Sequence, residues 1–108
     1  RRSTLAWLSR RETPPPFELE RRVRRAIERL TAPATTVPDV LVAAAFQCMR
    51  DAARSGVQRS AANELLAADA LLTYACEAAA EQGVDRLEQL TGDLDVNRFE
   101  ELAREALT

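Results

Sequence analysis

Two cysteines and a few acidic side chains are the groups in this sequence that are suited to catalysis or metal binding. The chain contains no histidine, so the commonest general base and the commonest metal ligand are both absent. Lysine is absent as well, whereas there are 15 arginines and 20 alanines, a composition typical of a GC-rich bacterial genome. These totals leave little material for an active site, and we expect a protein that is not an enzyme.

The two cysteines, Cys48 and Cys76, are expected to remain separate thiols. In a helical hairpin that turns near residues 56–59, their positions along the axis differ by about 14 Å at a rise of 1.5 Å per residue. A disulfide needs Cα atoms within about 7 Å, and two isolated thiols do not make a zinc site. The first residues also lack the apolar segment of a signal peptide, so we expect small buried thiols in a cytoplasmic protein.

The acidic clusters fit structural roles better than metal binding. Residues 93–97 (DLDVN) begin like a calcium-binding loop, but Arg98 and Arg104 replace the glycine and the bidentate glutamate of such a loop. Glu77 and Glu81 lie four residues apart on one helical face, where we expect a solvated strip, because a di-iron bundle also needs histidine. We therefore expect no metal and no cofactor.

Asp69 is the most informative acidic residue. It falls at the rim of an apolar helical face, where a carboxylate needs a polar partner or water. Three interpretations remain open: a contact with an arginine of another helix or subunit, a contact with a ligand, and a solvated edge position.

Residues 65–77 (LLAADALLTYACE) resemble the GDALLT helix of trans-prenyl diphosphate synthases, in which this segment helps to line the product pocket. The DDxxD metal motifs of that family are absent here, and the chain is much shorter. Ala68 stands where the family has glycine. The resemblance is confined to this segment, and no functional residue is carried over from it.

Apolar residues recur at helical spacing, which predicts an all-α fold, a small up-and-down helical bundle of three longer helices followed by short C-terminal helices. The longer helices are expected at residues 17–30, at residues 37–55, and from residue 58 or 60 to residue 82. In the first of them an apolar stripe is formed by Leu19, Val23, Ile27 and Leu30. Thr36 and Asp39 have the spacing of a capping box, and Gly56 and Gly83 are the expected stops of the second and third helices.

The short C-terminal helices are expected to follow directly. The first begins at Val84 and ends at Gly92. The second begins after Asp95 as its N-cap, with Leu94 and Phe99 in the two positions of a hydrophobic staple.

An N-terminal arm is expected at residues 1–16, ahead of a bundle domain at residues 17–108. The arm contains a short helix at residues 4–11 and a proline-rich, extended linker. Nine arginines and four glutamates in the first 29 residues give a net charge of +5, whereas the remainder of the chain has −7. We expect the arm to dock on this acidic remainder, or on a sister subunit, with Trp7 as an apolar anchor.

The second and third helices are apolar over more of their circumference than a lone bundle can cover. We therefore expect a non-enzymatic interaction protein that docks to a protein partner or to itself, with a homodimer as the favoured assembly. The expected interface residues are Trp7, Leu66, Asp69, Leu71 and Tyr74. Two alternatives stay open. One is an arginine-rich binder of nucleic acid or anionic surfaces, with specific nucleic-acid binding not expected. The other is a bundle that binds a small apolar ligand in a pocket between the second and third longer helices. The longest apolar run is too short to span a bilayer.

Overall fold

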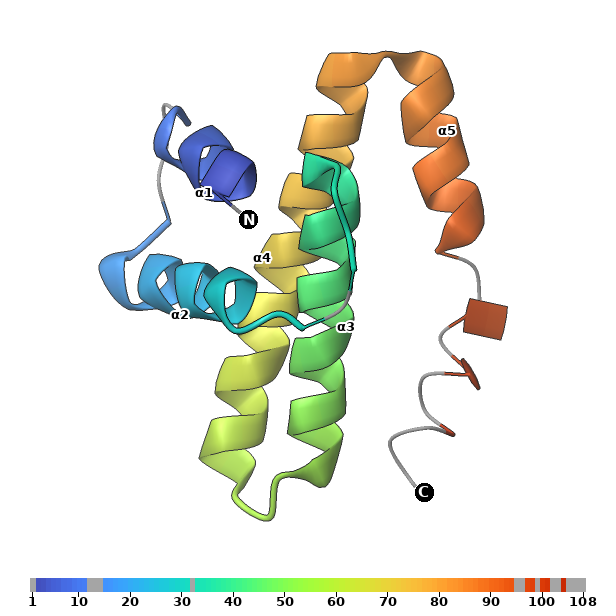
Figure 1. Cartoon of the computed structure of the whole chain (residues 1–108). Coiled ribbons are helices and arrows are strands. Elements are labelled where there is room, and N and C mark those ends of the chain that lie inside the picture. The colour runs from blue at the N-terminus through green and yellow to red at the C-terminus, as the bar shows by residue number, and fades with distance from the viewer. Residues whose placement is uncertain are drawn as a thin grey trace.

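The computed structural model describes residues 2–11, 15–31, 33–94, 97, 98, 100, 101 and 104 (Figure 1). The helices are α1 (Arg2–Ser9), α2 (Phe17–Glu28), α3 (Val37–Arg54), α4 (Gln58–Gln82) and α5 (Val84–Asp93). These described residues contain no strand, and the predicted all-α helical bundle is confirmed. The central element is the antiparallel α3–α4 hairpin, with α1 and α2 on one side of it and α5 on the other (Figure 1).

The start of α3 is set by the predicted cap. Thr36 is the N-cap, and its Oγ1 accepts a hydrogen bond from the backbone N–H of Asp39 at 3.3 Å. Pro38 lies in the first turn, where a backbone N–H has no intrahelical acceptor. The carboxylate of Asp39 pairs with Arg86 at 2.8 Å, so the beginning of α3 is also tied to α5.

Small side chains dominate the buried surface of the central hairpin. The buried small residues are Ala44, Ala45, Cys48 and Ala52 of α3 and Ala67, Ala68, Ala75, Ala78 and Ala79 of α4. Side chains of this size let two helix axes approach closely, which explains how a sequence so rich in alanine forms a packed core.

Larger apolar side chains from α1 and α2 complete the core. Val23 and Ile27 of α2 are fully buried, as the predicted stripe requires, and Leu30 follows directly after the helix. Trp7 and Leu8 of α1 belong to the same cluster of buried residues. The expectation that the arm packs on the bundle through apolar anchors is therefore confirmed.

The connection between α4 and α5 is a single residue. Gly83 has a φ of 130°, a conformation that favours glycine, and it ends α4 as predicted. The prediction for Gly92 was wrong, because α5 continues through it to Asp93. Gly92 does not have a positive φ, and a glycine in helical conformation costs only about 1 kcal/mol relative to alanine.

The C-terminal prediction falls largely outside the described residues, which leave out Asp95 and Phe99 and therefore the expected cap and staple. Residues 97, 98, 100, 101 and 104 are described, and they are helical. Among the helices of the described part of the chain, none combines the length and the hydropathy needed to cross a bilayer.

Candidate functional site

The structure divides the five expected interface residues between two faces of the bundle. Trp7, Leu71 and Tyr74 are buried, with exposed fractions of 8%, 0% and 7%. Leu66 is 59% exposed, and Asp69 is exposed beside it on α4. Leu66 and Asp69 are therefore the expected interface residues that are open to a partner, because the other three are buried within the chain.

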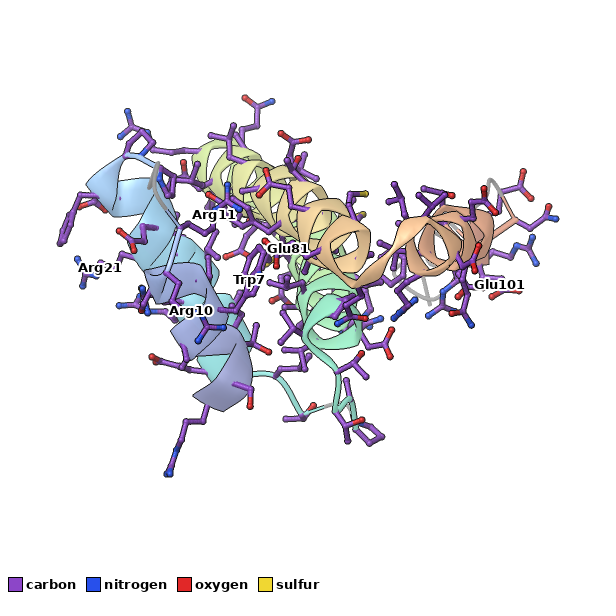
Figure 2. All side chains as sticks on the ribbon, turned by 90° about the horizontal axis from the view of Figure 1, so that it is seen from above. Trp7, Arg10, Arg11, Arg21, Glu81 and Glu101 are labelled. Carbon is purple, nitrogen blue, oxygen red and sulfur yellow. The ribbon has the colours of Figure 1, made fainter. Side chains whose placement is uncertain are left out.

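The buried group fixes the N-terminal arm to α4. The indole N–H of Trp7 donates a hydrogen bond to Oε2 of Glu81 at 2.8 Å. The Trp7 and Tyr74 rings meet edge to face, with centroids 6.2 Å apart, an arrangement worth about 1 kcal/mol beyond the buried area. Figure 2 shows Trp7 and Glu81 on the side of α4 that faces α1.

Arg11, just after α1, completes this contact. Its guanidinium lies 4.5 Å from the centroid of Tyr74 and 5.3 Å from that of Trp7, and it forms an ion pair with Glu77. Burial raises the pKa of Tyr74 and the nearby guanidinium opposes the rise, so the phenol stays neutral at pH 7. Glu77 and Glu81 keep part of the solvent exposure that the sequence predicted, but the prediction missed that both carboxylates also receive groups from the arm.

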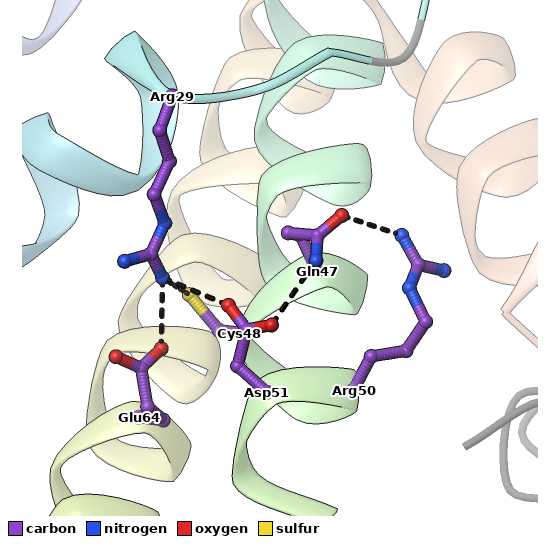
Figure 3. Close-up of polar contacts among 6 residues, drawn as sticks. All are labelled: Arg29, Gln47, Cys48, Arg50, Asp51 and Glu64. Carbon is purple, nitrogen blue, oxygen red and sulfur yellow. Dashed lines mark hydrogen bonds and ion pairs between the residues drawn. The ribbon is translucent and has the colours of Figure 1, made fainter. Parts of the chain in front are cut away.

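A second polar cluster, at the other end of α2, ties that helix to the hairpin (Figure 3). Nη2 of Arg29 lies 3.2 Å from Oδ2 of Asp51 and 3.0 Å from Oε2 of Glu64. Cys48 is fully buried nearby, as expected, with its Sγ 4.0 Å from the same nitrogen. Burial and the neighbouring Glu64 raise the pKa of Cys48 to about 12, so this thiol is a poor nucleophile at neutral pH.

The exposed side of α4 carries an uncovered row of mostly apolar and small residues. We call this row the outer strip, and it consists of Arg59, Ala62, Leu65, Leu66, Asp69 and Thr73, all of them exposed. At 100° per residue these positions fall within a sector of about 120°, opposite the buried face of the helix. Leu65 and Leu66 are 53% and 59% exposed, and because they are adjacent they form an apolar patch, unlike an apolar side chain exposed singly.

A cavity of about 900 Å³ lies on the other side of the hairpin. It is lined by Thr31, Pro33, Ala34, Thr35, Asp39, Val42, Ala43, Phe46, Leu90, Asp93, Leu94 and Arg98. The guanidinium of Arg98 lies 5.0 Å from the centroid of the Phe46 ring. This cavity lies between the loop before α3, α3 itself and α5, not between the second and third main helices, where the sequence suggested an apolar pocket.

Within the described residues, no three or more cysteine or acidic side chains are arranged so that they could hold a metal ion. The loop that begins like a calcium site contains Asp95 and Val96, which lie outside the described residues. No protein-family model, curated protein or solved structure matches this chain. The candidate site is therefore chosen from the geometry of the chain alone. We choose the outer strip, because two adjacent leucines are exposed on it.

Sequence reasoning missed Arg11 as part of the arm contact. The available signal was the pairing of Glu77 and Glu81 with Tyr74 on one side of the same helix, together with the surplus of arginine in the first 29 residues. Complementary charge at this distance along the chain indicates that two segments attract each other, but not which arginine reaches which carboxylate.

Proposed function

We propose that this protein is a non-enzymatic interaction protein, and that it binds a protein partner through the outer strip of α4. The observation that carries the proposal is the exposure of Leu65 and Leu66 on a helix whose opposite face is fully packed. Adjacent exposed leucines form the kind of apolar patch that marks a protein contact. Because each leucine is already almost half covered, burying the remainder against a partner would contribute about 1–1.5 kcal/mol each.

The test compares Leu66→Glu with Val84→Glu. Val84 is 70% exposed at the start of α5, so its replacement also puts a carboxylate at an exposed apolar position, but outside the outer strip. We expect the purified chain to show a mass above 12.0 kDa by light scattering, either alone or with a co-purified protein. Leu66→Glu should abolish that assembly with its helical circular dichroism unchanged, whereas Val84→Glu should preserve it.

The proposal fails if the wild-type chain stays at 12.0 kDa and carries no other protein through purification. It also fails if an assembly forms and the two variants affect it equally, because the contact would then not depend on the outer strip.

A second candidate function is the binding of an anionic surface, supported by Arg21, Arg22 and Arg25, which are exposed on α2. Other N-terminal arginines already form ion pairs within the chain, namely Arg11, Arg24 and Arg29. We expect weak binding that disappears at about 150 mM salt, where the Debye length is about 8 Å. Tight retention of DNA or RNA at that ionic strength in a gel-shift assay would favour this candidate instead.

A further inference from the structure

We infer that the partner of the outer strip is a second copy of this chain. The two α4 helices pack antiparallel through their outer strips, and the two-fold axis crosses them at the level of residue 64 along the helix. This inference rests on the proposed function and gives it a specific occupant. It is argued from the positions of the two charged residues of the outer strip, from the sizes of the residues between them, and from the open space around this part of the hairpin.

The charges of the outer strip are complementary about its own centre. Arg59 and Asp69 are its two charged residues, and each is five residues, or about 7.5 Å along the axis, from residue 64. In an antiparallel pair centred there, Arg59 of one copy lies opposite Asp69 of the other, and symmetry makes the contact twice. Neither side chain has an ion-pair partner within the described part of its own chain.

The residues between these charges suit the same register. Ala62 of one copy lies opposite Leu66 of the other, so a small side chain faces a large one on both sides of the axis. Leu65 lies next to the axis, where the symmetry places its counterpart from the second copy close by. A centre of apolar side chains with charged pairs at its ends is the usual composition of a protein interface.

This part of α4 is open to a second molecule. In Figure 1 the end of the hairpin that joins α3 to α4 extends beyond α2, so α3 is the helix that packs along α4 there. Figure 2 shows α2 and α5 on opposite sides of α4 and no helix of the described residues over its remaining face. One helix from each subunit makes a contact at the small end of interface sizes, so we expect a dissociation constant in the micromolar range.

The experiment is sedimentation of the full chain up to about 200 µM, a range that covers micromolar affinities. We expect the wild type to approach twice 12.0 kDa. Arg59→Asp and Asp69→Arg should each weaken the dimer about tenfold, because like charges then face each other twice. Their equimolar mixture should regain wild-type affinity within about threefold, because both opposite-charge contacts return in the heterodimer. Arg22→Asp on α2 is the matched control and should leave the affinity unchanged.

The double variant Arg59→Asp with Asp69→Arg identifies the orientation. In the antiparallel dimer it restores both contacts and should bind like the wild type, while the single variants are weak. If the two single variants dimerise as well as the wild type, the antiparallel register is overturned. A wild-type mass of 12.0 kDa throughout the range overturns the homodimer. A complex with a different protein that is lost in Leu66→Glu would then leave the proposed function standing without this partner.

Discussion

Two sides of α4 have very different surroundings. On the side that faces the arm, Tyr74 is buried against Trp7 and Arg11, and Glu77 and Glu81 pair with side chains of the arm while they stay partly exposed. The outer strip carries two adjacent leucines and has no such cover in the described residues. The contrast teaches that an apolar residue on a helix face becomes core when a segment of the same chain reaches it, and remains available for a partner when none does.

The largest expected effect comes from replacing Leu71, five residues after Leu66 and on the opposite side of the helix. Leu71 is 0% exposed, so Leu71→Glu buries an unpaired carboxylate and should cost more than about 4 kcal/mol, enough to unfold the chain. Circular dichroism and denaturant unfolding measure this directly. Leu66→Ala is the control and should change the free energy of unfolding by less than about 0.5 kcal/mol.

If both leucine variants destabilised the chain equally, the two sides of α4 would not differ in the way described. A stable Leu71→Glu chain would mean that this position is accessible to solvent and available to a partner.

The next largest effect concerns the arm. Trp7→Ala removes a nearly buried indole and its hydrogen bond to Glu81, and should lower the free energy of unfolding by about 3 kcal/mol. Proteolysis ahead of Pro14 should become faster. Trp7→Phe keeps an aromatic ring against Tyr74 and should lose less than half as much. Unchanged stability and protease sensitivity in Trp7→Ala would contradict the view that the arm is part of the core.

A smaller effect is expected at Arg11, whose side chain is partly exposed and screened by solvent. Arg11→Ala removes the guanidinium from the Tyr74 ring and from Glu77, and should cost about 1.5 kcal/mol in the free energy of unfolding. High salt should reduce the part of this loss that comes from the ion pair with Glu77. Arg22→Ala, at an exposed position of α2, is the control and should be close to neutral.

The smallest effect is a dependence on alkaline pH that originates in the core. Burial raises the pKa of Cys48 from 9.0 to about 12, so the folded state holds this proton more tightly than the unfolded state. The stabilisation is therefore complete below pH 9 and is lost as the pH rises from 9 towards 12, by slightly more than ~1 kcal/mol at pH 10.

Burial also raises the pKa of Tyr74 and adds a contribution of the same sign. The variant Cys48→Ala separates the two, because its stability should fall less between pH 8 and pH 10. If the free energy of unfolding fell equally with pH in the variant and the wild type, burial would not raise the pKa of Cys48. Alkylation at pH 8 gives an independent measure, with half-buried Cys76 expected to react well before Cys48.

Local patterns in the sequence predicted the helices well, because the responsible interactions span only a few residues. The stripe of Val23 and Ile27, the cap at Thr36 and the stop at Gly83 are all of this kind. Gly83 ends a helix because its backbone has a positive φ, whereas Gly92 keeps a helical backbone and α5 continues through it. The residue type is the same at both positions, so it does not tell which of the two glycines ends a helix.

The partition of apolar residues between core and surface was harder to predict. Leu66 and Leu71 have the same chemistry, and what separates them is which neighbouring helix covers each side of α4, a matter of tertiary packing. The bond from Trp7 to Glu81 spans 74 residues, so no local window contains both partners.

That same separation determines when the arm reaches its site during synthesis. Trp7 leaves the ribosome 74 residues before Glu81, and at 5–20 residues per second this interval is about 4–15 s. During that time the apolar side of α1 has no α4 to bind. Among the described helices, α1 is thus made first and is among the last to find its place, and the nascent chain exposes Trp7 for seconds before the bundle closes over it.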